Sequence, residues 1–325
     1  MDKDDRFLSE RLRDELRVFC YRMSGSLHDA EELVETTLFR VSGLPIPLTD
    51  TAATRTELHK VTTRICLGEL ADRPARGLPS LTHPPSDPYL PPLQPEEYDF
   101  WVEPFPDDLY PEPDYAGDKR YSESEGITLS FIAALQELPP RARASLVLSE
   151  VMGWTVNVLA EVMGIGVVDA RHTLDEAREA MARSYKEEHG RRESPPEEEA
   201  DALSMRYLHS WETGDVDGLM ERLTADIVLQ LPPSPSWYEG RDAVSHYLSS
   251  QAQVGGGRSR WRLLPRHANG QPAFGVYARE GGRDIYRAHS IQVLRFEGAL
   301  IGEVISFAYP EMFPLFRLFP EVTAR

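Results

Sequence analysis

The chain has 325 residues, enough for two or three domains that each bury a core. It contains 35 Lys and Arg and 53 Asp and Glu, which gives a formal net charge of −18. This charge opposes nucleic-acid binding over the surface as a whole, so that DNA contact would depend on local basic patches. No apolar run approaches the roughly 18 residues of a membrane span, and the two cysteines, Cys20 and Cys66, lie in apolar helical context. We therefore expect a cytoplasmic protein with no membrane partner, whose two thiols are reduced and buried.

Residues 1–78 are predicted to form a first helical domain. Apolar residues recur at helical spacing on two faces, with Leu8, Leu12, Leu16 and Phe19 on one and Leu33, Val34, Leu38 and Val41 on the other. A further helix is expected from Glu57 to Leu70, with Leu58, Val61, Ile65 and Cys66 inward. Lys60 and Arg64 on this helix are candidate phosphate contacts, and a solvated helical face is the simpler explanation for both. The segment from Ser42 to Glu57 contains no aromatic residue on which unpaired bases could stack.

Residues 79–122 are predicted to be a linker. From Leu81 to Arg120 the chain contains ten prolines, ten Asp or Glu and two Lys or Arg, a composition that makes a poor core. Apolar side chains, mostly aromatic, interrupt it at Tyr98, Phe100, Trp101, Phe105, Leu109 and Tyr110. Their density indicates a segment that packs against a domain as a strap.

Residues 123–185 are predicted to form a second helical domain that contains a helix–turn–helix. Pro139-Pro140 and Gly153 interrupt the apolar spacing, and two short helices follow around a turn at Met163-Gly164. The second of them, from Val168 to Met181, is the type of helix that enters a DNA major groove. From Ala160 to Ser184, however, three arginines, among them Arg171 and Arg178, stand against five acidic residues, a net charge of −2. Such a helix repels phosphates, so we expect weak DNA affinity or none.

Residues 186–198 read as a second linker, and residues 199–325 as an α+β domain. Amphipathic helices are expected at Ala200–Gly214, Val216–Leu223 and Arg241–Ser250. Strands are expected at Ile227–Leu231, Trp261–Ala268, Ala273–Arg279, Tyr286–Phe296 and Leu300–Ala308. The sequence shows no metal-ligand spacing, no phosphate-binding glycine loop and no nucleophile signature, and we expect neither metal nor cofactor.

Several motifs resemble extracytoplasmic-function (ECF) sigma factors. Ala134-Leu135-Gln136-x-Leu138-Pro139-Pro140-Arg141-x-Arg143-Ala144, with Gly153-Trp154 and Ala160-Glu161, resembles region 4, which reads the upstream promoter element. Phe19–Met23 and Gly25–Val34 resemble region 2, and in this resemblance Glu32, Leu33 and Val34 belong to the helix that docks on core RNA polymerase. Glu35 and Thr36 depart from the usual motif.

The resemblance extends to the C-terminus. Trp237-Tyr238-x-Gly240, Asn269–Ala273 and Phe313-Pro314-x-Phe316 are similar to the SnoaL-like domain fused to one sigma subgroup, and Trp101–Asp107 resembles a linker motif of that subgroup. The resemblance implies two helical sigma-like domains and a C-terminal α+β cone of the nuclear-transport-factor-like fold. It also implies core RNA polymerase and promoter DNA as partners, and a linker that threads through the polymerase as the alternative to a strap.

The implied cone encloses a pocket, for which the candidate wall residues are Trp237, Tyr238, His246, His267, Tyr277 and Tyr309. Period-two alternation groups His289 with Arg287, Ile291 and Val293, and Glu303 with Ile301 and Ile305. If His289 and Glu303 both point inward, they form a general acid/base pair. The alternative is a core histidine and a surface glutamate. Asp226 and Asp284 are candidates by residue type alone.

Two functions follow from these features. The first is a divergent sigma factor with impaired promoter recognition, in which the C-terminal domain restrains the DNA-reading regions. The second is a sigma-derived scaffold that acts as a cofactor-free cyclase or isomerase on a small natural-product substrate. A regulator that binds a ligand or protein without acting on DNA or substrate is a third possibility.

Overall fold

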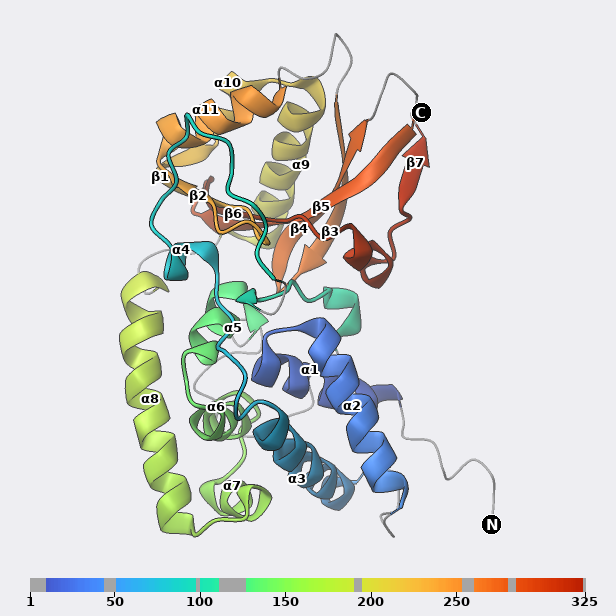
Figure 1. The fold of residues 1–325 in the computed structure, drawn as a ribbon, viewed down its shortest axis with the longest axis vertical. Helices are drawn as coiled ribbons and strands as arrows, with labels where there is room; N and C mark the ends of the chain where they lie inside the picture. The colour runs from blue at the N-terminus through green and yellow to red at the C-terminus, as the bar shows by residue number, and fades with distance from the viewer. Residues whose placement is uncertain are drawn as a thin grey trace. The chain divides into compact units, whose positions relative to one another are not determined.

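The computed structural model describes residues 10–43, 51–97, 100–110, 127–189, 195–252, 260–279 and 285–323. The chain divides into two compact units (Figure 1). Met1–Gly77 and Leu109–Gly190 form the first, which we call the helical unit, and Leu78–Asp108 and Arg191–Arg325 form the second, the sheet unit. Expectations placed on Leu8, Tyr98, Asp284 and residues 44–50 fall outside the described residues. The predicted fold class, helical regions followed by an α+β domain, is confirmed.

The helical unit consists of two groups of helices. The first group is α1 (Glu10–Ser24), α2 (Leu27–Ser42) and α3 (Ala52–Glu69). The second is α5 (Leu129–Gln136), α6 (Pro140–Leu146), a π-helical turn (Val147–Val151), α7 (Val156–Met163) and α8 (Val167–His189). Cys20 and Cys66 are buried and free, as expected.

The third helix begins earlier than predicted, because Thr51 caps it. The Thr51 hydroxyl accepts a hydrogen bond from the Thr54 backbone N–H at 3.2 Å, which satisfies one of the amides left open at a helix start. The buried face of α3 is also more polar than expected. Leu58 and Cys66 are buried, but so are His59, Thr62 and Thr63. This follows from its packing, since α3 contacts both α2 and α7.

In the described part of the sheet unit, three helices lie against a seven-stranded sheet. The helices are α9 (Glu197–Thr213), α10 (Val216–Met220) and α11 (Arg241–Ala252). The strands are β1 (Leu223–Gln230), β2 (Trp237–Glu239), β3 (Trp261–Ala268), β4 (Gln271–Arg279), β5 (Ile285–Glu297), β6 (Leu300–Phe307) and β7 (Glu321–Thr323). Their order is β2-β1-β6-β5-β4-β3, with β7 paired to β5, and β1 runs parallel to β6.

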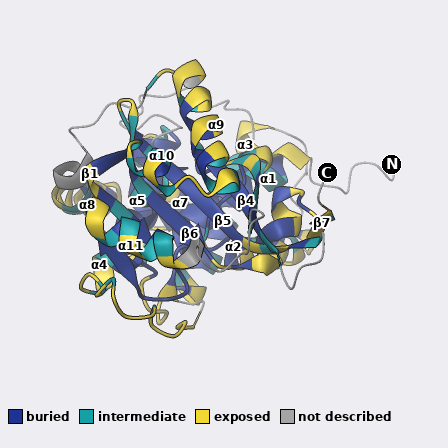
Figure 2. Cartoon of the chain, turned by 90° about the horizontal axis from the view of Figure 1, so that it is seen from above, coloured by how far each residue is buried: buried dark blue, intermediate teal, exposed yellow. Residues whose placement is uncertain are grey.

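One face of the sheet, which we call the inner face, packs against α9, α10 and α11. It contributes Ile227, Leu229, Leu263, Phe274, Val276, Leu294 and Val304 to a core that also contains Leu203, Tyr207, Val244 and Leu248 of the helices. Figure 2 shows β4 to β6 as largely buried, while the solvent side of α9 is exposed. Residues that alternate with these, such as Gln230, Arg295 and Glu303, lie on the opposite, outer face.

The segment Leu78–Asp108, which we call the strap, belongs to the sheet unit. From the short helix α4 (Pro79–Thr82) onward, the chain contacts the end of β1 and the loop between β1 and β2. The Leu93 N–H donates to Ser236 Oγ at 2.8 Å, and the Ser80 N–H donates to Gln230 Oε1 at 2.9 Å. Trp101, Val102 and Phe105 are buried. Aromatic density in the linker therefore did predict packing against a domain. None of the helices in the described ranges has the length and apolarity needed to cross a membrane.

Candidate functional site

The helix–turn–helix forms where the sequence predicts it. Thr155 caps α7 by accepting a hydrogen bond from the Val158 N–H at 3.4 Å. Gly164 ends the helix at φ +66°, a left-handed conformation that favours glycine because it lacks a Cβ. Three residues later α8 begins; α7 and α8 are in contact, and Leu159 and Val162 of α7 and Leu174 and Ala177 of α8 are all buried.

The start of α8 presents an unusual surface for a DNA reader. Val167 is 44% exposed and Val168 is 82% exposed. Arg171 and His172 are exposed one turn further on, and His172 Nε2 lies 3.3 Å from Glu176 Oε1. Apolar, cationic and acidic side chains therefore share the face that a recognition helix would turn to the major groove.

Arg178, a predicted DNA contact, is occupied within the fold. Its Nε donates to Glu150 Oε1 at 2.9 Å, and its Nη1 donates to Asp175 Oδ1 at 2.9 Å. Glu150 is itself buried, so Arg178 neutralises a carboxylate that would otherwise be costly to desolvate. The structure therefore gives Arg178 a structural partner and leaves Arg171 exposed.

The other two predicted DNA contacts come from α3, which packs against α7. Lys60 Nζ lies 3.4 Å from Glu57 Oε1 and 3.7 Å from Glu161 Oε1 of α7. Arg64 Nη2 lies 3.7 Å from the point that a Cβ on Gly164 would occupy, and so beside the turn of the helix–turn–helix. The fold thus brings Lys60 and Arg64 to the predicted reading motif, which sequence spacing alone could not show.

His59 is buried at this contact. Its ring lies 5.3 Å from that of Phe19 in α1 and 5.0 Å from that of Trp154, two residues before α7, both edge-on. Nδ1 is 3.0 Å from the Arg55 carbonyl oxygen. Burial lowers the pKa of His59 from 6.5 to about 4, and the nearby Arg55 charge acts in the same direction. The imidazole is therefore neutral at pH 7.

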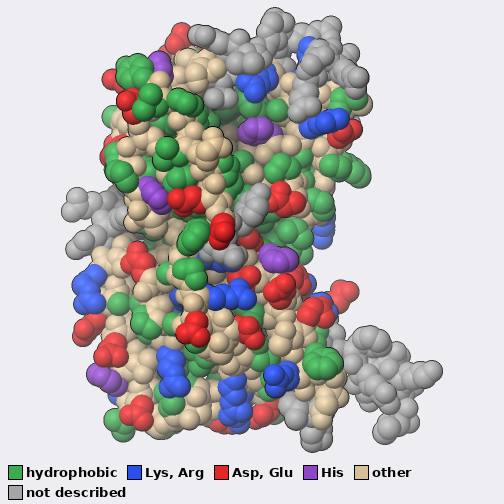
Figure 3. All heavy atoms as spheres, in the orientation of Figure 1, with side chains coloured by type: hydrophobic (Ala, Val, Ile, Leu, Met, Phe, Trp, Pro, Cys, Tyr) green, Lys and Arg blue, Asp and Glu red, His purple; other side chains and the backbone are tan. Residues whose placement is uncertain are grey.

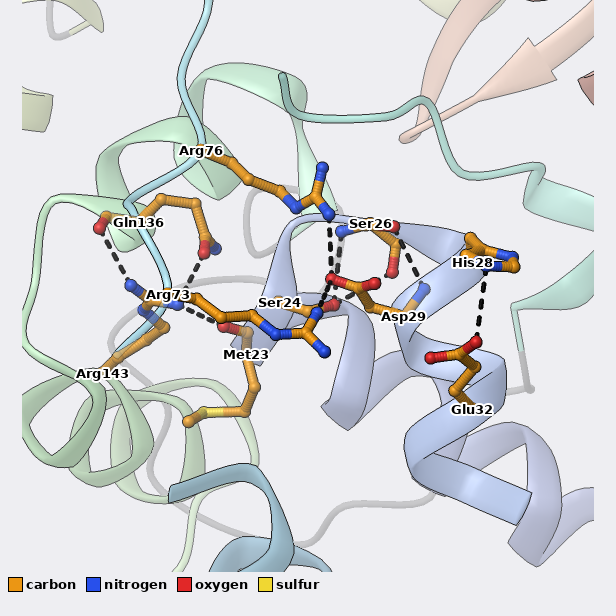
Figure 4. Close-up of polar contacts among 10 residues, drawn as sticks. All are labelled: Met23, Ser24, Ser26, His28, Asp29, Glu32, Arg73, Arg76, Gln136 and Arg143. Atoms are coloured by element: carbon orange, nitrogen blue, oxygen red, sulfur yellow. Dashed lines mark hydrogen bonds and ion pairs between the residues drawn. The ribbon is translucent and has the colours of Figure 1, made fainter. Parts of the chain in front are cut away.

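Arg143 joins the two groups of helices in the helical unit (Figure 4). Its Nε donates to the Leu135 carbonyl at 2.9 Å, and Nη2 donates to the carbonyls of Gln136 and Leu138 at 2.9 and 3.0 Å. Nη1 donates to Gln136 Oε1 at 2.6 Å and to the Met23 carbonyl at the end of α1. The guanidinium thereby satisfies carbonyls at the C-terminal ends of both α5 and α1.

Gln136 completes the junction. Its Nε2 donates to the Arg22 carbonyl at 3.1 Å, and its Cδ lies 3.1 Å from where a Cβ on Gly25 would stand. Gly25 also has φ +72°, so no other residue fits there without strain. Burial lowers the pKa of Arg143 to about 10, which leaves it charged at neutral pH. Figure 4 also shows Arg73 and Arg76, which lie 2.9 Å from Asp29 Oδ2 at the start of α2.

The predicted polymerase-binding residues of α2 lie on two different faces. Leu33 and Val34 are buried among the helices, whereas the Glu32 side chain is 63% exposed and lies 3.5 Å from His28. Phe39, which is not among the predicted contact residues, is 80% exposed. Phe39 follows Glu32 by seven residues, a separation that places both on one side of a helix, so the signal was present in the sequence.

On the sheet, His289 and Glu303 do not form a pair. Val276 pairs with Ser290 and Tyr277 with Ala288, so His289 is the extra residue of a β-bulge. Its ring lies 5.0 Å from Trp261 of the inner-face core, and its Nδ1 lies 3.2 Å from Ser290 Oγ. His289 is exposed on one side, and partial loss of solvent around the ring, together with the charge of Arg260, lowers its pKa.

Glu303 is held on the outer face. It accepts from Gln230 Nε2 at 2.7 Å through Oε1 and from Arg295 Nε at 3.0 Å through Oε2. Arg295 pairs with Glu303 and Phe296 pairs with Ile301, so Gly302 of β6 is the extra residue of a second bulge, which puts Ile301 in the inner-face core although Glu303 is not there. The predicted grouping of His289 with Ile291 and of Glu303 with Ile301 was therefore wrong, because each bulge changes the face of the residues beyond it, whereas Ile291 stays grouped with Val293 and Glu303 with Ile305.

The predicted pocket residues are also spread apart. Tyr238 lies in the inner-face core, where its ring stacks on Tyr247 at 4.9 Å. Trp237 Nε1 donates to the His83 carbonyl of the strap at 2.8 Å, and the Tyr277 hydroxyl donates to the Phe319 carbonyl at 2.9 Å. Tyr309 is buried beside Phe307. His246 and His267 are exposed, and His246 lies 4.4 Å from the Tyr89 ring.

Two motifs that the sequence analysis treated separately meet in the sheet unit. The Phe105 N–H donates to Asn269 Oδ1 at 2.7 Å, and the Asn269 N–H returns to the Phe105 carbonyl at 2.9 Å. The Gly270 N–H donates to Asp107 Oδ1 at 3.0 Å, and burial raises the pKa of Asp107. The linker motif Trp101–Asp107 is thus bound by the β3–β4 turn. Within the described ranges, no group of His, Cys, Asp and Glu could hold a metal ion.

Comparison with known proteins gives matches along most of the chain. Residues 128–181 match the sigma-70 region 4 family, and residues 205–304 match the SnoaL-like domain family. The chain is 34% identical over 313 residues to the ECF RNA polymerase sigma factor SigG of Mycobacterium tuberculosis, covering 95% of this chain and 82% of that protein.

Two further relatives agree with this. The ECF RNA polymerase sigma factor SigE of Mycolicibacterium smegmatis is 26% identical over 176 residues, which is 54% of this chain and 59% of SigE. The crystal structure of the Mycobacterium tuberculosis ECF sigma factor SigJ has a TM-score of 0.60 at 19% identity, covering 95% of this chain and 98% of SigJ, and so shares the fold.

Proposed function

This chain belongs to the family of ECF RNA polymerase sigma factors, and on that premise we propose that it directs transcription initiation through α2 and α8 once the two helix groups of its helical unit separate. The proposed separation of the two helix groups rests on one observation, the packing of α3 on the helix–turn–helix. In such motifs the first helix crosses the DNA backbone while the second enters the groove. Here α3 lies against that first helix, α7, with Lys60 beside Glu161.

Promoter recognition by the closed helical unit is weak in this proposal. The predicted recognition segment has a net charge of −2, and Arg178 is bound to Glu150 and Asp175. Lys60 is paired with acidic side chains, so it has little positive charge to offer phosphates. In Figure 3, Lys and Arg on the visible face of the helical unit are interspersed with Asp and Glu and form no single basic stripe.

The sheet unit supports a restraining role. The chain that connects α3 to α5 passes through Leu78–Asp108, and this segment belongs to the sheet unit. Its hydrogen bonds to Asn269, Gly270 and Ser236 fix it there. Because the two helix groups are joined through this anchored strap, its release would lengthen the free connection between them.

The polymerase contact is assigned to the exposed face of α2. Glu32, Thr36 and Phe39 lie on that face, and Phe39 supplies an exposed aromatic anchor of the kind enriched at protein interfaces. The enzymatic alternative has no comparable support, because Glu303 is bound to Gln230 and Arg295 and lies on the face opposite the His289–Trp261 contact.

The test is to mix the purified chain with core RNA polymerase, isolate the complex on a sizing column, and assay promoter opening on a library of upstream sequences. We expect a complex, and weaker complex formation by Phe39→Ser than by Phe319→Ser, a matched control because Phe319 is 77% exposed but lies in the sheet unit. Absence of a complex even at low salt, where residual charge contacts are strongest, would overturn the proposal.

A further inference from the structure

We infer that Val168 reads the methyl group of a thymine in the upstream promoter element, an inference that rests on the assignment of α8 as the reading helix. Val168 is the second residue of α8, and the N-terminal residues of a recognition helix are those that meet base edges. At 82% exposed, its isopropyl group is not needed for the core of the helical unit.

The chemistry of valine limits what it can recognise. It offers no hydrogen-bond donor or acceptor, so among the groups on the floor of the major groove it favours the thymine C5-methyl and leaves the donors and acceptors of G, C and A unpaired. The neighbouring Val167 is 44% exposed, about half as much as Val168, so it presents less apolar surface. Asp169 Oδ2 lies 3.1 Å from the Cβ position of Gly166, turned back toward the start of its own helix.

The next turn of α8 supplies the complementary contact. Arg171 follows Val168 by three residues and so lies on the same side of the helix, where an exposed guanidinium matches the O6 and N7 acceptors of guanine. His172, on the same side, is paired with Glu176 at 3.3 Å. This arrangement predicts an element in which a thymine lies close to a guanine, read by one apolar and one cationic side chain.

The test uses holoenzyme assembled from the full chain and core RNA polymerase. Double-stranded DNA with a randomised upstream element is selected for binding, and the position at which thymine is enriched is then replaced by deoxyuridine, which removes the methyl group alone. We expect the wild type to bind the deoxyuridine DNA about fourfold more weakly, the loss corresponding to one buried methyl group. Val168→Ser should bind both DNAs equally, whereas Val168→Thr, which keeps a methyl group, should retain the preference.

Val156→Ser at the start of α7 is the control, since the first helix of the motif faces the phosphate backbone. It should leave the thymine preference intact. If the holoenzyme selects DNA but shows no thymine enrichment, or if Val168→Ser still discriminates thymine from deoxyuridine, the role of Val168 is refuted while the sigma-factor function stands. If the holoenzyme binds no DNA in the library, both the role of Val168 and the proposed sigma-factor function are refuted.

Discussion

Acidification should destabilise the helical unit through His59. In the folded protein burial lowers the pKa of this imidazole to about 4, against an ordinary value of 6.5. Below pH 6.5 the unfolded chain therefore binds a proton that the folded chain excludes, so His59 favours folding above pH 6.5, and this contribution is lost progressively as the pH falls toward 4. With these two pKa values, the free energy of unfolding should fall by about 2 kcal/mol between pH 7.5 and pH 5 from this residue alone.

Urea unfolding at several pH values, followed by tryptophan fluorescence, measures this loss, because Trp154 lies 5.0 Å from the His59 ring. Carboxylates and other histidines titrate in the same range, so the comparison is between the wild type and His59→Gln. The variant is less stable at pH 7.5, but its curve of stability against pH should be flatter by about 2 kcal/mol. Parallel curves would show that His59 is not held neutral by burial, and the described packing between α3 and Trp154 would then be wrong.

Three further predictions concern the junction, the strap and the arginines of α8. Arg143→Met should lower the free energy of unfolding by about 3–5 kcal/mol, because carbonyls of α1 and α5 lose their donor, and equal stability of variant and wild type in urea would contradict this. Asn269→Ala should speed hydrogen exchange of the Phe105 amide, since Oδ1 is its acceptor, while unchanged exchange would argue against a fixed strap. Arg171→Ala should weaken holoenzyme–DNA binding by about 1–3 kcal/mol and relax the preference for guanine, and Arg178→Ala should do neither, so the reverse result would return Arg178 to the DNA contacts.

Much of the fold follows from local patterns. The strands at Trp261–Ala268 and Tyr286–Phe296 and the helix at Arg241–Ser250 were placed within a few residues of β3, β5 and α11, because periodicity and turn residues are properties of neighbouring positions. The early start of α3 was missed, although Thr51 is a typical capping residue. The π-helical turn at Val147–Val151 has no signal that distinguishes it from α-helix in a single sequence.

The candidate sites depended on information that periodicity does not contain. A bulge changes the register of one strand against its neighbour, so the positions of His289 and Ile301 could not be derived from alternation within one strand. The contacts of Lys60 with Glu161 and of Phe105 with Asn269 join segments more than 100 residues apart. The helix–turn–helix was predicted well, because its turn is marked locally by Gly164.

The most direct test of the account is to prevent the two helix groups from separating. Lys60 and Glu161, whose side-chain charges lie 3.7 Å apart, are replaced by cysteine and joined with a short bismaleimide, while the native Cys20 and Cys66 are buried. The single-cysteine variants, treated in the same way, control for the substitutions and the reagent. Promoter opening with core RNA polymerase is then measured before and after crosslinking. The account predicts that the double variant opens promoters before crosslinking and fails to do so afterwards; equal opening by the crosslinked chain would contradict it.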